Sequence, residues 1–416
     1  MNWLSILQTV CWVFSSFVSL CFAYQIVYLF VPFLVKSRPH REEKLHKYAV
    51  MIAARNEEMV LPHLLQSINA QDYPAELIDV YVVADNCTDN TAKAARACGA
   101  IVYERFNKEQ VGKGYALDYL LGHMEQDGGL DRYDAFMVFD ADNLLDSQYV
   151  RNMNRIVGDG FKVFCGCRSS KNFGTNWITS GYGHWFLRES ALMNRARMLV
   201  GASGLVNGTG FGFTLDVLKK AGGWKFFTLS EDTEFCAWCA INDVRIGYCH
   251  EALFYDEQPT GFLVSLRQRV RWMQGGMEVS IKYGGRLLRN VFKFCKSSWY
   301  SFELMTLTFW GGLLGALAVV FSIVIGALNG GGSGFALTLL SIFCNSYLML
   351  LFNGVLIVAV EWKRIAASAK EKILSVFTYP LFMMTFVIAA VMALFSKREW
   401  RPIAHTVAIS SEQLQK

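Results

Sequence analysis

Charged side chains are absent from three long stretches of this chain of 416 residues. Residues 1–35, 304–360 and 374–396 contain no Asp, Glu, Lys or Arg. A helix crosses the hydrocarbon core of a bilayer with about 20 apolar residues, and each stretch is at least that long. These stretches exclude an ordinary water-soluble protein, and we expect membrane helices at both ends of the chain.

Nothing basic precedes the first apolar stretch, which argues against a cleaved signal peptide. The basic cluster follows the stretch instead, between Lys36 and Lys47. Because basic residues beside a membrane helix favour the cytoplasmic side, we expect the N-terminus outside and the following domain in the cytoplasm. The sequence therefore predicts a multi-pass protein of the cell (plasma) membrane.

The composition also argues against two other classes of protein. Most of the eleven cysteines of the chain are expected to be free thiols, because disulfides are implausible in a cytoplasmic domain, and Cys236 and Cys239 lack the second pair that a zinc site needs. The net charge of +5 is modest, and the basic clusters flank the apolar stretches. We expect no disulfide framework and no nucleic-acid partner.

The distribution of charge divides the chain into five parts. We predict an N-terminal membrane helix (1–36), a cytoplasmic domain (37–265), interfacial helices (266–300), a C-terminal membrane region with two or three spans (301–396) and a tail (397–416). Three spans that start inside leave the tail outside, whereas the basic residues at 397–401 favour the inside. Both positions of the tail stay open.

Three apolar runs in the cytoplasmic part end in polar turns. The runs at 48–54, 78–84 and 135–139 suit strands buried on both faces of a parallel sheet. Strand, turn and helix in repetition predict an α/β, doubly wound domain. Ligands of such sheets bind at the carboxyl ends of the strands, where these polar turns lie.

Asp140 and Asp142 form a turn after the third run. Two carboxylates at this spacing on a turn can converge on Mg²⁺ or Mn²⁺, which in turn binds a diphosphate. The alternative is an ordinary surface turn, because Asp-x-Asp is common in unrelated proteins.

Arg55, Glu57 and Asp85 follow the first two runs, where a nucleotide would lie. Asp85 is suited to accept the N3–H of a uracil ring, although capping of the following helices is an equally good interpretation. Lys113 stands between two glycines before a helix-like segment, which suits a phosphate.

Two further motifs lie in the second half of the cytoplasmic part. Gly208, Thr209 and Gly210 permit close backbone approach, as at an acceptor pocket, or form only a tight turn. Glu231 and Asp232 offer a carboxylate that can deprotonate an attacking hydroxyl. Their alternative role is to be the acidic first turn of a helix capped by Ser230.

Gln268, Arg271 and Trp272 are spaced to share one face of a helix. Arg271 can neutralise a diphosphate, and Trp272 offers a flat apolar surface to a sugar ring. A basic helix at the membrane surface is the simpler interpretation, and it applies to the other face of this helix.

The order of these motifs resembles the family 2 inverting glycosyltransferases. It is most similar to their membrane-bound processive branch, with the cellulose, chitin, hyaluronan and poly-N-acetylglucosamine synthases. The resemblance implies a GT-A-like domain that binds a nucleotide-sugar, with Asp85 on uracil and Asp232 as general base. The metal would be held by Asp140 and Asp142, and Gln268, Arg271 and Trp272 would hold the diphosphate and the end of the acceptor. The motifs described above add further substrate-binding candidates, which are Arg55, Glu57, Lys113, Gly208, Thr209, Gly210 and Glu231.

The resemblance further implies transfer of a hexose from UDP-glucose or UDP-N-acetylglucosamine to a growing β-linked polysaccharide, coupled to export, with Mg²⁺ or Mn²⁺. The chain lacks the Phe-x-Val-Thr-x-Lys motif of bacterial cellulose synthases, which argues against cellulose. Since few spans make a small channel, we expect a second copy or a partner subunit.

Two alternatives differ in the product or in the class of protein. A non-processive transferase that adds a sugar to a membrane lipid fits the same motifs, because ceramide glucosyltransferases carry a related Arg-Trp element. A transporter or receptor with a nucleotide-binding domain is disfavoured, because the apolar stretches lack the ionisable residues that mark a substrate path.

Overall fold

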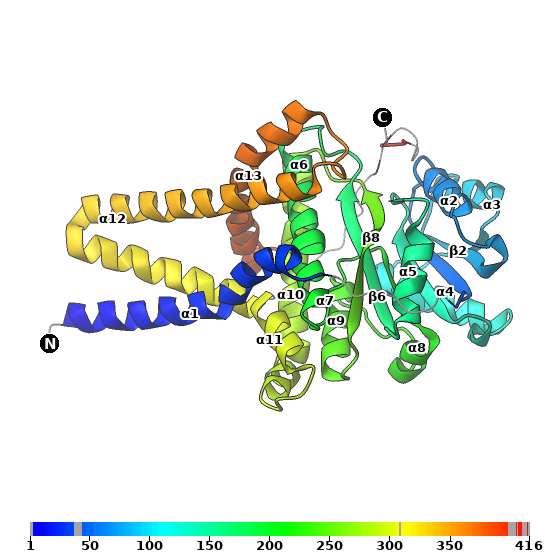
Figure 1. Cartoon of the computed structure of the whole chain (residues 1–416), viewed down its shortest axis with the longest axis horizontal. Helices are drawn as coiled ribbons and strands as arrows, with labels where there is room; N and C mark the ends of the chain where they lie inside the picture. The colour runs from blue at the N-terminus through cyan, green and yellow to red at the C-terminus, as the bar shows by residue number, and fades with distance from the viewer. Residues whose placement is uncertain are drawn as a thin grey trace.

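The computed structural model describes residues 3–36, 44–307, 309–397, 405, 407–409 and 414. Figure 1 shows an α/β domain at one end of the molecule and long apolar helices that project from the other. The N-terminus lies at the far tip of these helices, and the C-terminus lies over the α/β domain.

Within the described residues, the sheet has eight strands in the order β3-β2-β1-β4-β7-β6-β8-β5. Strands β1 to β4 pair in parallel, whereas β7 runs antiparallel to both β4 and β6. The strands are β1 (Tyr48–Ala54), β2 (Ile78–Asp85), β3 (Ile101–Arg105), β4 (Ala135–Asp140), β5 (Leu144–Leu145), β6 (Val163–Ser170), β7 (Phe211–Thr214) and β8 (Ile246–Asp256).

Helices cover both faces of this sheet, and each face has its own hydrophobic core. Central strand residues such as Met51 and Met137 are fully buried, as their continuous apolar runs predict. The predicted α/β fold is therefore confirmed. The helices of this domain are α2 (Leu61–Asn69), α3 (Thr91–Ala97), α4 (Lys113–Gln126), α5 (Tyr149–Gly158), α6 (Trp177–Leu187), α7 (Arg195–Leu199), α8 (Leu215–Ala221) and α9 (Glu231–Ile241).

Two helices connect this domain to the apolar part of the chain. Helix α10 (Phe262–Val291) packs against α9, and α11 (Ser298–Leu307) packs against α10. The apolar helices are α1 (Trp3–Leu34), α12 (Phe309–Glu361) and α13 (Ala369–Phe395). All three are long and apolar enough to cross a membrane.

Helix α12 is a hairpin rather than one straight helix. It reverses at Gly331, whose φ of 59° lies in the left-handed region that glycine adopts without strain. Figure 1 shows the two arms of α12 beside α1, whereas α13 runs across their direction. Helix α13 packs against α12 and also along α10 and α6, so it lies between the apolar hairpin and the helices that continue into the α/β domain.

A buried ion pair connects the α/β domain to the apolar helices. Arg197 Nε lies 3.1 Å from Glu303 Oε1, and the two side chains are 1% and 0% exposed. Beside them, Trp299 donates a hydrogen bond to the hydroxyl of Tyr28 on α1. This pair joins α7 to α11 at the point where the chain leaves the α/β domain.

We predict that Arg197→Met lowers the free energy of unfolding by about 3–5 kcal/mol, because Glu303 is left as an unpaired buried charge. The measurement is the midpoint of thermal denaturation of the detergent-purified protein. The double variant Arg197→Met, Glu303→Leu is the control and recovers most of the loss. Equal destabilisation in the two variants would contradict this account.

Candidate active site

A cavity of about 1110 Å³ lies at the carboxyl ends of β1, β2 and β4 and continues between the apolar helices. Most of the side chains singled out from the sequence line it, although they come from distant parts of the chain. Those that line the cavity are Arg55, Glu57, Asp85, Lys113, Asp140, Asp142, Gly208, Glu231, Asp232, Gln268, Arg271 and Trp272.

Glu57 and Asp85 do not cap the helices that follow them. Helix α2 begins after Val60 and α3 after Asn90, so the capping interpretation of these two carboxylates is wrong. Asp85 Oδ1 instead accepts a hydrogen bond at 2.6 Å from Arg105 Nη1 within a buried ion pair. The carboxylate of Asp85 is thereby fixed at the edge of the cavity.

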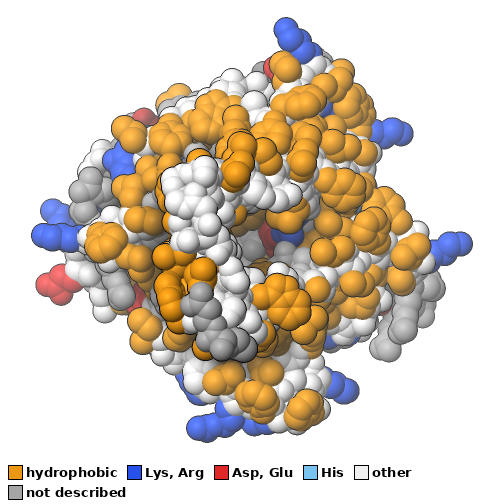
Figure 2. Space-filling model, turned by 90° about the vertical axis from the view of Figure 1, so that its left-hand side faces the viewer, with side chains coloured by type: hydrophobic (Ala, Val, Ile, Leu, Met, Phe, Trp, Pro, Cys, Tyr) orange, Lys and Arg blue, Asp and Glu red, His pale blue; other side chains and the backbone are white. Residues whose placement is uncertain are grey.

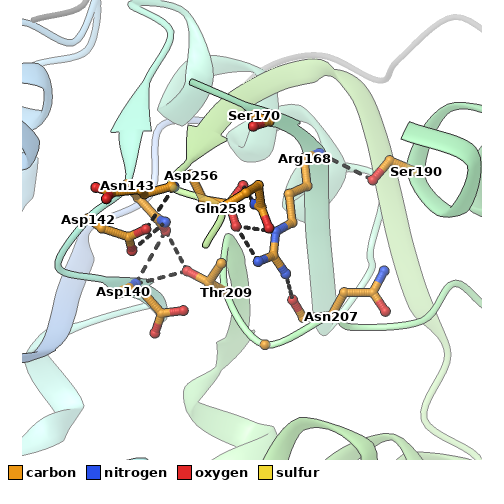
Figure 3. A network of polar contacts seen from close by, with 12 residues as sticks. Asp140, Asp142, Asn143, Arg168, Ser170, Ser190, Asn207, Thr209, Asp256 and Gln258 are labelled. Atoms are coloured by element: carbon orange, nitrogen blue, oxygen red, sulfur yellow. Dashed lines mark hydrogen bonds and ion pairs between the residues drawn. The ribbon is translucent and has the colours of Figure 1, made fainter. Parts of the chain in front are cut away.

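Asp140 and Asp142 lie on the turn after β4, and each has a different partner. Lys113 Nζ donates to Asp140 Oδ1 at 2.5 Å and to the carbonyl of Gly208 at 2.8 Å. Asp142 is 4% exposed, and its Oδ2 accepts a hydrogen bond from the backbone amide of Glu257 at 2.8 Å. Figure 3 shows this turn and the polar network behind it. The cation of Lys113 therefore bridges the Asp140 turn and the glycine-rich loop.

Thr209 and Gly210 lie behind the cavity wall rather than on it. The hydroxyl of Thr209 accepts a hydrogen bond at 2.9 Å from the backbone amide of Asp140 and lies 2.5 Å from Asn143 Oδ1. A Cβ at Gly210 would lie 2.2 Å from the ring of Phe254. These two residues shape the turn that presents Asp140, while Gly208 borders the cavity.

Glu231 and Asp232 are the first two residues of α9. Ser230 precedes them, but its side chain makes no capping hydrogen bond, so this part of the helix-cap interpretation is not observed. Burial and the charge of Asp232 raise the pKa of Glu231 to about 7, and burial also raises the pKa of Asp232. Two adjacent carboxylates in such surroundings share a proton near neutral pH.

The shared proton predicts a pH dependence for any reaction in which Asp232 accepts a proton. Burial raises the pKa of Asp232 above the usual value of an aspartate, which is about 3.9, so the base is lost at a higher pH than an exposed carboxylate would be. We expect kcat/KM to fall about ten-fold per pH unit below this raised pKa and to level off above it. The check is a profile of kcat/KM against pH. A profile that stays flat down to about pH 4 would contradict the assignment.

Gln268, Arg271 and Trp272 share the face of α10 that borders the cavity, as their spacing predicts. Trp272 packs against Trp185, with 5.2 Å between the ring centroids. Arg269 points to the other face, where its Nη1 donates to Thr385 Oγ1 on α13 at 2.5 Å. One helix thus presents a cation and an indole to the cavity and holds α13 with its opposite side.

Several charged side chains that line the cavity were not predicted from the sequence, among them Arg168, Asp256 and Glu257. Arg168 forms an ion pair with Asp256, and burial raises the pKa of Asp256 to about 6. Lys171 Nζ lies 3.4 Å from Glu257 Oε2 in a second buried pair. Asp256 ends β8 and Glu257 follows it, so the strand-end argument used for β1, β2 and β4 would have found both carboxylates.

The part of the cavity that lies between the apolar helices has walls of a different character. Every residue of α11, α12 and α13 that lines it is uncharged, and most are aliphatic or small. Figure 2 shows charged side chains at the bottom of a hollow that hydrophobic side chains surround. The lining residues from these helices are Leu304, Leu307, Gly312, Leu313, Gly315, Ala316, Val319, Val320, Phe386, Val387, Ala390, Val391, Ala393 and Leu394.

The carboxylates fit a divalent cation that shares its ligands with a substrate. No group of three or more His, Cys, Asp or Glu side chains in the described part of the chain forms a metal site by itself. Asp140 and Asp142 both line the cavity, and the buried Oε2 of Glu57 has no hydrogen-bond partner among the described residues. Mg²⁺ is commonly held by one or two carboxylates plus substrate phosphates and water, which this donor set allows.

Comparisons with known proteins agree with this geometry. The family model described as "Glycosyltransferase like family 2" matches residues 46–275. A β-monoglucosyldiacylglycerol synthase of Synechocystis sp. is 25% identical over 240 residues, which are 56% of this chain and 48% of that protein. A poly-β-1,6-N-acetyl-D-glucosamine synthase of Staphylococcus epidermidis is 25% identical over 278 residues, which are 60% and 58% of the two chains.

The match thus spans about half of the length of these curated relatives. Among solved structures, a mannosyltransferase of Pyrobaculum calidifontis in complex with GDP-Man and Mn²⁺ has a TM-score of 0.59 at 16% identity. The similarity covers 94% of this chain and 99% of that one, so it includes the apolar helices as well as the α/β domain. At this identity the likeness establishes the fold, which is of the GT-A type.

Proposed function

The chain belongs to the glycosyltransferase-like family 2, and on that premise we propose that it transfers a sugar from a UDP-sugar, with inversion, to a hydroxyl group of a membrane lipid. We choose a lipid as the acceptor because the wall of the cavity between the apolar helices is itself apolar. The carboxylates at the other end of the same cavity supply the chemistry.

The donor would lie across the strand ends. Asp85 would accept the N3–H of the uracil ring, and Lys113 and Arg271, which line the same cavity, would supply positive charge for the diphosphate. Mg²⁺ or Mn²⁺, held by Asp140 and Asp142, would neutralise charge on the diphosphate when it is bound. The sugar then projects toward Asp232 and the wall that Gly208 borders.

The reaction is a single displacement at the anomeric carbon. Asp232 accepts the proton of the acceptor hydroxyl, the hydroxyl oxygen bonds to C1, and the bond from C1 to the UDP oxygen breaks. UDP leaves with the bonding electron pair, and Arg271 and Lys113 stabilise the developing negative charge. One base and no covalent intermediate produce inversion.

The acceptor would reach Asp232 from the bilayer. A sugar polymer in a channel is bound by polar and aromatic side chains, whereas the walls from α11 to α13 consist of Leu, Val, Ala, Gly and Phe. Aliphatic walls of this kind lower the free energy of a bound acyl or prenyl chain by removing its surface from water. The lipid interpretation, which the sequence left as the alternative, is therefore favoured over a growing polysaccharide.

One observation supports the polysaccharide as the second candidate. Trp185 and Trp272 pack together and both line the cavity, so they offer a surface to the terminal sugar of a chain. A polymer would additionally need an exit path, and a second copy or a partner subunit would have to complete it. A lipid acceptor needs neither.

We also propose a topology in which the N-terminus lies outside the cell and the tail inside. Helix α1 and the two arms of α12 would make three crossings, while α13 lies along the membrane surface against α10 and α6. Residue 405 contacts Glu57, so the end of the chain lies on the same side as the α/β domain. With three crossings in total, the basic residues at 397–401 lie inside, as basic residues beside a membrane helix favour. Most of these residues lie outside the described part of the chain.

The proposed function is tested by UDP release from a panel of UDP-sugars, with Mn²⁺ or Mg²⁺ and the detergent-purified protein. We expect one donor to be consumed faster when mixed micelles contain a lipid with a free hydroxyl, such as diacylglycerol. Soluble β-linked oligosaccharides are the matched comparison and are expected to have no such effect. Stimulation by the oligosaccharides alone would promote the polysaccharide candidate.

A further inference from the structure

A π-helical segment, Arg188–Asn194, connects α6 to α7. It packs against α1 and α12, so it lies where the α/β domain meets the apolar helices. Its first two residues, Arg188 and Glu189, both line the cavity. Because π-helical turns are rare and occur frequently at functional sites, and because the proposed chemistry uses neither residue, this pair calls for an explanation.

Arg188 and Glu189 form an ion pair whose orientation is set from α1. Arg188 Nη1 donates to Glu189 Oε1 at 2.5 Å, and Arg188 Nη2 donates to Gln25 Oε1 at 2.7 Å. The two side chains are 18% and 13% exposed, so they are shielded from bulk water but border the cavity. A guanidinium has more N–H groups than these contacts use, so Arg188 can also donate to a ligand.

The apolar wall of the cavity begins close to this pair. Gln25, which holds the guanidinium, is about one helical turn from Phe22 on α1. A Cβ at Gly311 would lie 2.9 Å from the ring of Phe22, so this part of α1 contacts the start of α12. The residues that follow on α12 include Gly312 and Gly315, which line the cavity. The ion pair therefore lies near the inner end of the apolar wall.

The proposed base lies on the other side of the pair. Phe186, two positions before Arg188, has its ring centre 3.5 Å from the guanidinium of Arg168. A Cβ at Gly208 would lie 3.9 Å from both Arg168 Nη1 and Asp232 Oδ2. A lipid whose hydroxyl reaches Asp232, and whose apolar chains lie between α12 and α13, therefore has its headgroup beside the ion pair.

The charges around this headgroup position cancel. Arg188 is paired with Glu189, and Arg197, which lies 3.9 Å from Glu189, is paired with Glu303. A headgroup that carries a phosphate would lose its hydration here without meeting a surplus of positive charge. A neutral headgroup has no such cost, and its ester oxygens accept hydrogen bonds from a guanidinium.

We propose that Arg188 and Glu189 bind the headgroup of the lipid acceptor and select a neutral one. Arg188 donates hydrogen bonds to its ester oxygens, and Glu189 repels the phosphate of an anionic lipid. Gln25 is a positioning residue, since it holds the guanidinium without lining the cavity. The inference rests on the proposed function, because it names the class of lipid that the same site uses.

Two lipids that differ in charge test this assignment. Diacylglycerol and phosphatidylglycerol both carry a free hydroxyl, but only the second has a phosphate. Each is mixed into neutral detergent micelles with the full-length protein, the preferred UDP-sugar and Mn²⁺, and kcat/KM is obtained from UDP release. We expect the native enzyme to prefer diacylglycerol. Glu189→Gln leaves Arg188 unopposed, so we expect this preference to fall about ten-fold.

The reverse change of charge is expected to have the reverse effect. Arg188→Gln leaves Glu189 unopposed, so the preference for diacylglycerol rises about ten-fold. The double variant Arg188→Gln, Glu189→Gln keeps the site neutral, and its preference stays within about three-fold of the native one although both rates fall about ten-fold. Lys293→Gln is the matched control. It changes the charge of an exposed residue outside the cavity by the same amount as Arg188→Gln and leaves the preference unchanged.

The opposite directions of the two single variants separate headgroup binding from a structural role. A pair that only connects the π-helical segment to α1 would affect the two lipids alike. Proportional loss with both lipids, an unchanged preference in both single variants, or a native enzyme that prefers phosphatidylglycerol would overturn the proposal.

Calorimetric titration of UDP with Mn²⁺ is the check on the donor site, and we expect native affinity in all these variants. If the native protein binds UDP but neither lipid accelerates UDP release, the proposed function fails. If diacylglycerol accelerates release and the variants do not change the preference, only the present inference fails.

Discussion

Asp232→Asn is expected to lower kcat for sugar transfer by about 10²–10⁴-fold, because it removes the proposed general base. The substitution keeps the size and the hydrogen-bonding capacity of the side chain at the start of α9. UDP affinity is therefore expected to stay within about three-fold of the native value, since the base does not contact the nucleotide. The measurement combines single-turnover transfer with calorimetric titration of UDP.

Glu231→Gln is the control for this prediction. Glu231 also lines the cavity and shares a proton with Asp232, so its replacement is expected to shift the pH profile rather than to abolish transfer. The pKa that lies near 7 is that of Glu231, so the variant is expected to lose any titration near pH 7 and to keep the loss of activity at lower pH that belongs to Asp232. If Glu231→Gln were the inactive variant and Asp232→Asn the active one, the roles of the two carboxylates would be exchanged.

Ala316→Phe is expected to reduce transfer to a lipid acceptor by about 10²-fold, because the ring would occupy the apolar part of the cavity. Slow hydrolysis of the UDP-sugar, in which water replaces the acceptor, is expected to continue at the native rate. The expected effect is thus a selective loss of acceptor use with an intact donor site. Both rates are obtained from one assay that measures UDP release with and without lipid.

Leu317→Phe is the matched control, because Leu317 is the next residue on the same arm of α12 and does not line the cavity. It is expected to leave both rates unchanged, since its side chain is 39% exposed on the outer surface of the helix. Equal loss of transfer in the two variants would indicate a general disturbance of α12. Full activity in Ala316→Phe would argue that the acceptor does not enter between α12 and α13.

The sequence predicted the central part of the fold because its strands are continuous apolar runs. The strands β1, β2 and β4 stand where the runs at 48–54, 78–84 and 135–139 place them, and their carboxyl ends meet at the cavity. The antiparallel strand β7 was not predicted, because Phe211–Thr214 is short and contains a glycine. Periodicity carries little information over four residues.

The motifs likewise predicted that certain side chains would meet at the cavity. The prediction worked for side chains that are close to each other in the sequence or that follow the ends of strands. Gln268, Arg271 and Trp272 share a face because helical geometry fixes their spacing. Thr209 and Gly210 show the limit of this argument, because both lie behind the cavity wall while their neighbour Gly208 borders the cavity. Which of them touches a ligand depends on backbone angles that the sequence does not determine.

Contacts between distant segments were beyond the reach of sequence patterns. Nothing near His405 in the sequence indicates that it lies beside Glu57, since only the folded chain brings the two together. The direction of α13 also depends on contacts between segments that are distant in the sequence. Its composition is that of a membrane span, and packing against α10 and α6 sets its course across α1 and α12.

The central claim is that the cavity joins a nucleotide-sugar at the strand ends to a lipid that enters from the membrane. Mass spectrometry of the product formed in liposomes, with the preferred UDP-sugar in large excess over the hydroxyl lipid, tests it most directly. The account predicts lipid molecules that each carry one added sugar, and a product size that does not grow with time. A water-soluble β-linked polymer that lengthens with time, with the lipid unmodified, would contradict it.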